Sequence, residues 1–269
     1  MVSNVSVVGS SEDSKYIAYG DDSGYNDALV FAFFIFKRTK LKSIVRDIDD
    51  IKRRFKFPLG VGIHCRELNS GQIRKKKGLD HLSEEDINSV LNNVITVVNR
   101  YQGLARFGYA FTDKSLGAFS SGELVMQSTI GEADIALPIA PNPKGILGFL
   151  AQMCFANGPQ GGPNGPCAAD CQIFISPDPT MTKFIGPRST QAHYLTSGYI
   201  DDGRNIGKVD KVEPIIGGGK YPQLLDVADV LAYVCCHAIH KDPLQKKYNQ
   251  LYDRLEWRVG SEFVLDPSP

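Results

Sequence analysis

The segment from Pro222 to His240 is the most constraining feature of this sequence, because it is a strongly apolar helix that carries acidic residues. Leu, Val and Ala fill most of its positions, so we expect it to be buried over most of its surface. One polar stripe runs along it at spacings of three and four residues: Asp226, Asp229, Tyr233, His237 and His240. A helix cap accounts for one acid near the start, and an uncompensated buried carboxylate is costly. The second aspartate therefore needs a partner from elsewhere in the fold.

The rest of the pattern predicts an α/β protein with a mixed five-stranded sheet flanked by helices. Runs rich in aromatic and branched residues, bounded by turn formers, predict strands at residues 16–19, 28–36, 59–64, 104–112 and 172–176. Helical periodicity predicts helices at residues 42–55, 84–101, 145–155, 222–240 and 243–257. Ser83 and Asp86 have the spacing of a capping box at the start of the second helix.

We expect a single domain over residues 15–260, with a Gly- and Pro-rich loop at 156–166 and flexible termini at 1–14 and 261–269. The length of 269 residues and the 42% of hydrophobic residues are ordinary for a chain with a large core. The sequence contains no stretch of eighteen apolar residues, and its start lacks the pattern of a secretory signal. We therefore expect a cytoplasmic protein without a membrane partner, and its oligomeric state is open.

Acidic residues recur where predicted strands end. Asp21 and Asp22 follow the first strand, Asp113 follows the fourth and Asp178 follows the fifth. Sites in open α/β sheets lie beyond strand ends, so these carboxylates can converge with those of the last helix. A structural interpretation is also open, because Asp is common in turns and Asp226 can cap its helix. That interpretation explains Asp229 poorly.

A divalent metal ion is the economical reason for such a cluster. Neighbouring carboxylates repel one another, and Mg²⁺ or Mn²⁺ removes the repulsion while favouring hard oxygen ligands. A metal site of this kind can hydrolyse phosphodiesters by activating water and stabilising the leaving oxygen.

Charge is distributed unevenly along the chain. The 30 basic and 30 acidic residues cancel overall, but residues 37–77 hold fourteen Lys or Arg and four Asp or Glu. That segment therefore carries +10, and the remaining residues carry −10. One basic face could bind a nucleic acid, although such runs are also typical of solvated helix faces. The candidate nucleic-acid-binding residues are Lys52, Arg53, Arg54, Arg74, Lys75, Lys76 and Lys77.

Four motifs occur in a distinctive order. Residues 16–24 read Tyr-Ile-Ala-Tyr-Gly-Asp-Asp-Ser-Gly, and residues 226–233 read Asp-Val-Ala-Asp-Val-Leu-Ala-Tyr. Between them lie Ile-His-Cys-Arg-Glu-Leu at 63–68 and Phe-Thr-Asp-Lys at 111–114. This set resembles the motifs of a bacterial family. In chain order, that family has an opening strand with Asp-Glu-Ser-Gly, a His-x-x-Glu-Leu stretch, a strand that ends near Lys and a late helix with Gln-x-Ala-Asp. The family is called domain of unknown function 3800, and the resemblance covers about residues 15–257.

The resemblance implies an RNase H-like fold and a metal-dependent nuclease. Acids on the first strand, on later strands and on the last helix would hold the metal. Carried onto this chain, Asp21 is the central ligand with Asp22 beside it, and Asp229 is the helix ligand.

The remaining roles are less defined by the resemblance. Asp178 is a further ligand, or Asp113 takes that place, and Glu67 is another candidate. His64 could orient a phosphate or a water molecule. Asp226 stands where the family usually has Gln, so it either strengthens metal binding or marks a changed site. The alternative function is a non-catalytic protein that binds nucleic acid or another partner on the same fold.

Overall fold

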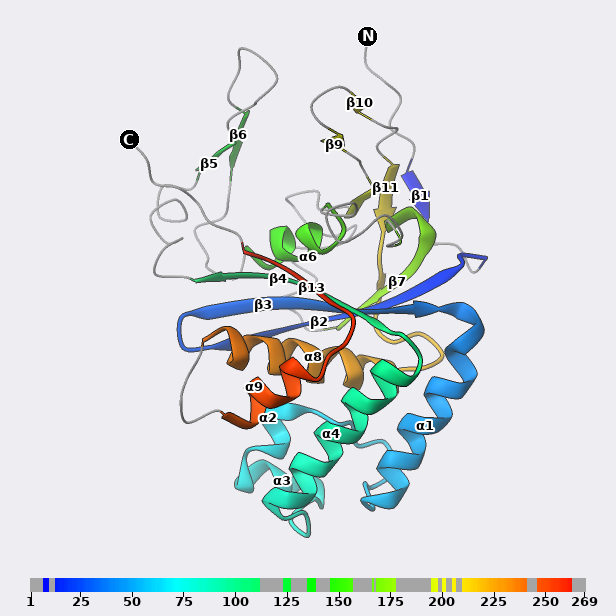
Figure 1. The fold of residues 1–269 in the computed structure, drawn as a ribbon, viewed down its shortest axis with the longest axis vertical. Helices are drawn as coiled ribbons and strands as arrows, with labels where there is room; N and C mark the ends of the chain where they lie inside the picture. The colour runs from blue at the N-terminus through cyan, green and yellow to red at the C-terminus, as the bar shows by residue number, and fades with distance from the viewer. Residues whose placement is uncertain are drawn as a thin grey trace.

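The fold is seen in a computed structural model of the whole chain (Figure 1). The structure describes residues 7–9, 13–111, 123–126, 135–138, 146–156, 166, 168–177, 195–197, 200–201, 205–206, 210–240 and 246–262, and every structural statement below concerns these ranges. Asp113, Asp178 and most of the predicted loop at 156–166 lie outside them. Within the described ranges, no helix is both long enough and apolar enough to cross a bilayer.

A six-stranded mixed sheet forms the centre of the molecule (Figure 1). Its strands lie in the order β12 (Ile215–Ile216), β7 (Cys171–Ile175), β2 (Tyr16–Tyr25), β3 (Ala28–Lys37), β4 (Leu104–Phe111) and β13 (Arg258–Glu262). Strands β2, β3 and β4 pair antiparallel in succession. Strand β7 joins β2, β12 joins β7 and β13 joins β4, each in parallel. The predicted α/β class with a mixed sheet flanked by helices is confirmed.

Strand β3 explains why both faces of the sheet are covered. Its nine apolar residues from Ala28 to Phe36 alternate between the two faces, so each face needs a layer that excludes water. Helices α1 (Leu41–Arg54), α4 (Glu84–Arg100), α8 (Gln223–Ile239) and α9 (Lys246–Asp253) lie on one face, and α6 (Ile146–Ala156) lies on the other (Figure 1). The two cores meet at β3, where Phe34 belongs to the first and Phe33 to the second.

The helices predicted from periodicity are present. Helix α4 begins after Ser83, whose hydroxyl accepts a hydrogen bond from the Asp86 N–H at 3.1 Å. The Asp86 carboxylate accepts one from the Ser83 N–H at 3.0 Å, so the predicted capping box is confirmed. The last helix is shorter than predicted, because α9 ends at Asp253 and the chain soon enters β13.

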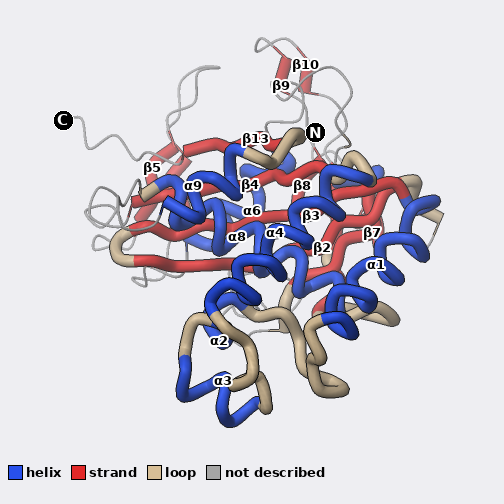
Figure 2. Tube along the Cα trace, turned by 60° about the horizontal axis from the view of Figure 1, so that its bottom comes forward, coloured by secondary structure: helices blue, strands red, loops and turns tan. Residues whose placement is uncertain are grey.

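Residues 59–64 do not form the predicted strand. They run as a loop toward two short helices, α2 (Cys65–Leu68) and α3 (Gly71–Lys77), which project beyond the sheet in Figure 2. The backbone N–H groups of Ile63 and Cys65 donate to the carboxylates of Asp226 and Asp229 on α8. The strand prediction is wrong because these distant side chains, rather than another strand, satisfy the backbone donors.

Asp21 and Asp22 lie inside a strand and not in the predicted turn. Strand β2 continues to Tyr25, and the hairpin reverses at Asn26, whose φ is 52°, and Asp27. The apolar length of β3 allows residues 16–25 to pair without a break. The interpretation of Asp21 and Asp22 as turn residues is therefore wrong.

The sheet has six strands and not five, because four of the five predicted strands form and two edge strands were not predicted. Strand β12 has only the two residues Ile-Ile, and β13 reads Arg-Val-Gly-Ser-Glu, so neither has the long apolar run that predicts a strand. Three further small sheets pair β1 (Val7–Gly9) with β11 (Asp210–Glu213) and β8 (Leu195–Ser197), β9 (Ile200–Asp201) with β10 (Asn205–Ile206), and β5 (Glu123–Met126) with β6 (Ile135–Pro138). Strand β1 belongs to the N-terminal segment for which no regular structure is expected.

Candidate functional site

Asp21 lies on the face of the sheet that α8 covers. Its partner on β3 is Ala32, which belongs to the core beneath α8. The Asp21 carboxylate accepts hydrogen bonds from the Asp22 backbone N–H, at 2.9 Å, and from Ser176. Ser176 directly follows β7, and its N–H donates to the Gly20 carbonyl at 3.0 Å. Asp21 is therefore the first residue past the paired parallel part of β2 and β7, where open α/β sheets hold their sites.

Asp229 reaches the same place from α8. Only 7% of its surface is exposed, and its Oδ2 accepts a hydrogen bond from the Cys65 N–H at 2.7 Å. The Cys65 thiol also hydrogen-bonds to this carboxylate, and the His64 Nδ1 lies 3.3 Å from its Oδ1. The charge of Asp229 contributes to the raised pKa of Asp21, so the acids of the first strand and of the last helix are near enough to interact.

Asp226 lies one turn before Asp229 on α8 and is enclosed by other groups. The Lys52 Nζ is 3.1 Å from its Oδ2, and the Ile63 N–H donates to its carboxylate. A Cβ atom at Gly62 would lie 2.6 Å from the Asp226 Oδ1. Glycine is therefore the residue that lets the loop approach Asp226 this closely.

The electrostatics of the three carboxyl groups favour a nearby cation. The pKa of Asp21 is raised well above its usual range, first by burial and then by the charge of Asp229. Burial also raises the pKa of Asp229, although the neighbouring His64 opposes it. For Asp226, burial raises the pKa more than Lys52 lowers it. The fold thus holds these acids where their negative charges are unfavourable.

The donor chemistry fits Mg²⁺ or Mn²⁺. Asp21 and Asp229 offer hard carboxylate oxygens near enough for their charges to interact, and Mg²⁺ is commonly bound by one or two carboxylates together with water and substrate phosphates. In the part of the chain that the structure describes, no group of three or more His, Cys, Asp or Glu side chains is arranged to hold a metal ion. The predicted further ligands Asp113 and Asp178 lie outside that part.

Two other predicted catalytic residues have different surroundings. Asp22 pairs with Phe31, whose ring belongs to the core on the α6 side, so its side chain is directed to the opposite face from Asp21. Its charge still contributes to the raised pKa of Asp21. Glu67 on α2 forms an ion pair with Lys77 on α3 at 3.3 Å. His64 is the predicted residue that does contact an acid of the site.

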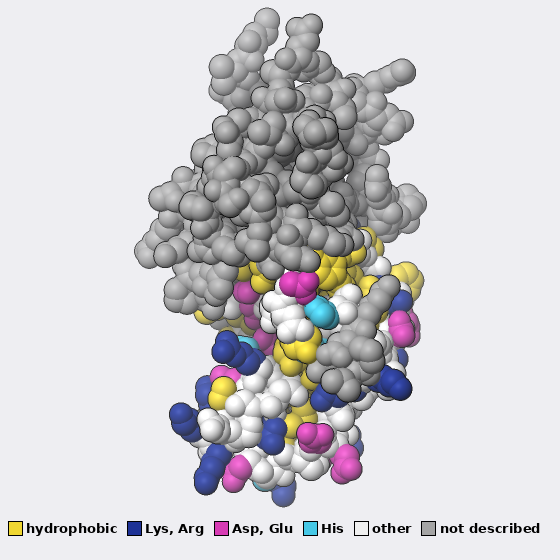
Figure 3. Space-filling model, turned by 90° about the vertical axis from the view of Figure 1, so that its left-hand side faces the viewer, with side chains coloured by type: hydrophobic (Ala, Val, Ile, Leu, Met, Phe, Trp, Pro, Cys, Tyr) yellow, Lys and Arg dark blue, Asp and Glu magenta, His cyan; other side chains and the backbone are white. Residues whose placement is uncertain are grey.

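The predicted nucleic-acid-binding residues fall into two groups. Four of them make contacts within the fold: Lys52 with Asp226, Arg53 with Asp50, Arg74 with the Leu68 carbonyl and Lys77 with Glu67. Arg54, Lys75 and Lys76 are exposed. Figure 3 shows one face of the molecule, on which Lys and Arg side chains alternate with Asp and Glu. The sequence run of basic residues thus does not give a uniformly basic surface on this face.

Sequence reasoning missed the residues that hold the acids in place. The run of basic residues marks Lys52 for nucleic-acid binding and not for the acidic site, and no local pattern marks Gly62, Cys65 or Ser176 as residues of the site. A lysine, a glycine or a serine carries no local sign of such a contact, because its partner lies more than a hundred residues away. Gly62 interrupts an apolar run in Val-Gly-Ile, and this interruption is the one local sign of a close backbone approach at that position.

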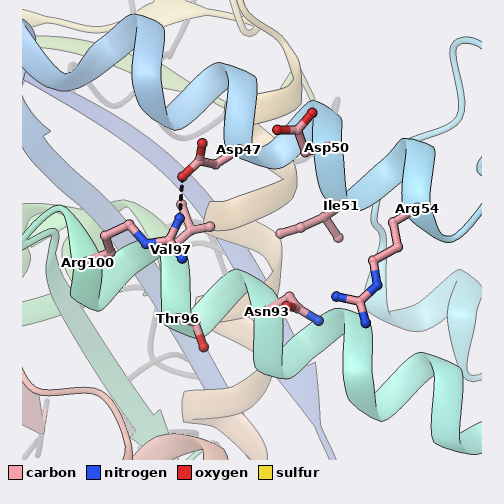
Figure 4. Close-up of a pocket in the computed structure, with 8 residues that line it drawn as sticks. All are labelled: Asp47, Asp50, Ile51, Arg54, Asn93, Thr96, Val97 and Arg100. Atoms are coloured by element: carbon pink, nitrogen blue, oxygen red, sulfur yellow. Dashed lines mark hydrogen bonds and ion pairs between the residues drawn. The ribbon is translucent and has the colours of Figure 1, made fainter.

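A pocket of about 190 Å³ lies between α1 and α4 (Figure 4). Its lining consists of Asp47, Asp50, Ile51, Arg54, Asn93, Thr96, Val97 and Arg100. The Asp47 carboxylate accepts hydrogen bonds from Arg100, at 2.7 Å, and from the Tyr101 hydroxyl, at 2.9 Å. These contacts join the two helices, and they explain the burial of the Asp47 carboxylate without a functional role.

Comparisons with models of known protein families, with curated proteins and with solved structures find no match for this chain. Its function must therefore be inferred from its own residues and their geometry.

Proposed function

We propose that this protein is a metal-dependent nuclease that hydrolyses phosphodiester bonds of DNA or RNA on an RNase H-like fold. The observation that carries the proposal is the pair Asp21 and Asp229, which lies past the parallel ends of β2 and β7 and in which Asp229 raises the pKa of Asp21. An acid on the first strand of the central sheet and an acid on α8 also agree with what the resemblance implies. This agreement supports membership of the family called domain of unknown function 3800.

The residues of the site have distinct roles in the proposed reaction. Asp21 and Asp229 would hold the Mg²⁺ or Mn²⁺ ion, which when bound supplies positive charge to the phosphate and lowers the pKa of a water molecule. Ser176 fixes the Asp21 carboxylate by its hydrogen bond. The half-exposed His64 is held by Asp229, so its ring can orient a water molecule or a phosphate oxygen.

Nucleic acid would be held largely through its phosphates. Lys75 and Lys76 on α3 and Arg54 at the end of α1 are exposed and suited to this contact. Helix α3 follows α2, whose first residue Cys65 is bound to Asp229 in the site. Contacts of this kind carry little sequence information and weaken steeply with salt.

Metal binding and cleavage test the proposal together. Wild-type protein should bind Mn²⁺ in a calorimetric titration and should cleave labelled DNA or RNA, single-stranded or duplex. We expect Asp21→Asn and Asp229→Asn to weaken Mn²⁺ binding at least about 100-fold and to abolish cleavage. Asp80→Asn, at an exposed position, serves as the matched control and should change neither.

The alternative is a non-catalytic nucleic-acid-binding or partner-binding protein. One observation favours it: Asp226 and Asp229 both accept hydrogen bonds from the backbone of residues 63–65, so part of their role is to hold that segment. If wild-type protein binds no Mn²⁺ and both site variants keep the wild-type behaviour toward nucleic acid, the nuclease proposal is wrong and this alternative remains.

A further inference from the structure

Lys52 and Asp226 form an ion pair inside the candidate site. The Lys52 Nζ lies 3.1 Å from the Asp226 Oδ2, and the two side chains are 19% and 15% exposed. The pair joins α1 to α8 across 174 positions of sequence. Removing two charges from water is costly, so the burial of this ion pair needs a structural or functional explanation.

The surroundings hold this ion pair next to the proposed metal ligands. Gly62 and the Ile63 N–H enclose the Asp226 carboxylate from the side opposite α8. Asp226 and Asp229 are three residues apart on one face of α8, so their Cβ atoms are about 5–6 Å apart. The charge of Asp226 acts on Asp229, so the Lys52–Asp226 pair lies within electrostatic reach of a proposed metal ligand.

We propose that Lys52 is the resident cation of this site, and that its ammonium compensates Asp226 in place of a second divalent ion. The protein then binds one Mg²⁺ or Mn²⁺ per chain, at Asp21 and Asp229. This inference rests on the proposed function and deepens it, because it sets the number of metal ions that the site uses.

The physical basis is the balance of charge around Asp226. Without the ammonium, a buried carboxylate would lie unpaired within a turn of Asp229, and a divalent cation would be the available counter-charge. Lys52→Met removes the charge and keeps an unbranched apolar chain. Asp226→Asn removes the opposite charge and keeps a carbonyl oxygen that the Ile63 N–H can still reach.

The test is a Mn²⁺ titration followed by electron paramagnetic resonance, which counts bound ions per chain without substrate. We expect one ion for the wild type, two for Lys52→Met and one for the double variant Lys52→Met/Asp226→Asn. Lys42→Met, at an exposed position of the same helix, is the matched control and should bind one ion. Circular dichroism verifies that each variant is folded.

A second comparison keeps the inference testable if Lys52→Met does not fold. In Asp226→Asn the ammonium loses its carboxylate and repels the remaining ion, so Mn²⁺ should bind about tenfold more weakly. Adding Lys52→Met to this variant should restore the wild-type affinity. An affinity that stays equal in the wild type, Asp226→Asn and the double variant would overturn the inference.

The outcomes separate this inference from the proposed function. Two ions in the wild type, or one ion in both the wild type and folded Lys52→Met, would overturn the role of Lys52 while leaving a metal-dependent nuclease in place. One ion in the wild type and two in Lys52→Met, without cleavage of any nucleic acid, would support the role of Lys52 and contradict the function. No ion in the wild type and one in Lys52→Met would contradict both, because the wild type would lack the ion at Asp21 and Asp229. No ion in any of these proteins would contradict both.

Discussion

Asp21 links function and stability at a single residue. Burial and the charge of Asp229 hold its pKa well above the usual range. An acid whose pKa is raised by folding contributes stability that is fully present below its unfolded pKa, near 4, and lost as the pH rises through the folded value. In the absence of metal, ionised Asp21 therefore lowers the free energy of unfolding at neutral pH.

We predict that Asp21→Asn stabilises the metal-free protein at pH 7 by about 1–2 kcal/mol, because the substitution removes a buried charge. The gain should shrink as the pH falls toward 4, where the wild-type carboxyl is protonated. Urea unfolding in the presence of a chelator at several pH values measures both effects. Added Mn²⁺ should stabilise the wild type and not the variant; equal stabilisation of the two would argue against Asp21 as a ligand.

Gly62 has a separate, steric role at the same site. We expect Gly62→Ala to destabilise the protein by about 1–3 kcal/mol, because the new Cβ would lie 2.6 Å from the Asp226 Oδ1. The loss should be smaller when Asp226→Ala is present in the same chain. Gly71→Ala is the control, since its Cβ would meet only the end of Arg74 at 4.0 Å. Thermal unfolding compares the wild type with Gly62→Ala, Asp226→Ala, their double variant and Gly71→Ala, and equal losses for the two glycine variants would contradict the proposed contact.

At the scale of elements, Asp47 joins α1 to α4. Burial by itself raises the pKa of Asp47, but hydrogen bonds from Tyr101, Arg46 and Arg100 outweigh it, so the pKa lies below the usual value. A group with a lowered pKa contributes stability that is present above its unfolded pKa and lost as the pH falls through its folded value. The connection between the two helices should therefore weaken in acid.

Asp47→Asn should lower the free energy of unfolding at pH 7 by about 1 kcal/mol, an estimate kept small because the arginine partners are largely exposed. The difference from the wild type should be full above about pH 4 and should disappear as the pH falls through the lowered pKa of folded Asp47. Asp50→Asn, whose partner Arg53 lies on the same helix, is the control and should cost less than about 0.5 kcal/mol. A loss for Asp47→Asn that is independent of pH would show that its charge is not the cause.

At the scale of the whole molecule, five of the seven predicted basic residues are exposed, although the total charge is neutral. Arg53 and Lys77 also pair with acids, whereas Lys75 and Lys76 are exposed on α3. The logarithm of the binding constant falls linearly with the logarithm of the salt concentration. Replacing both exposed lysines with alanine should make this fall less steep, by about 2 in slope, since each phosphate contact contributes nearly one. Fluorescence anisotropy with a labelled oligonucleotide measures the slope. An unchanged slope would remove α3 from the nucleic-acid contact.

Local pattern predicted the elements whose stabilising contacts are close in sequence. Helix α4 is an example, because the Ser83 and Asp86 cap and the apolar stripe lie within one segment. Strands β2, β3, β4 and β7 were also predicted, since their apolar residues must be buried wherever the chain goes. The edge strands β12 and β13 were missed, because pairing with β7 and β4 defines them and their own residues do not.

The sequence alone determined that α8 is buried, that it carries two acids, and that at least one of them needs a partner from elsewhere. Only the tertiary structure decided which partners these are: Cys65 and His64 for Asp229, and Lys52 and Ile63 for Asp226. The reason is physical. Hydrophobic periodicity and helix caps predict burial and hydrogen bonds among residues that are close in sequence. The donor or charge that compensates a buried carboxylate can come from any part of the chain, and only folding brings it there.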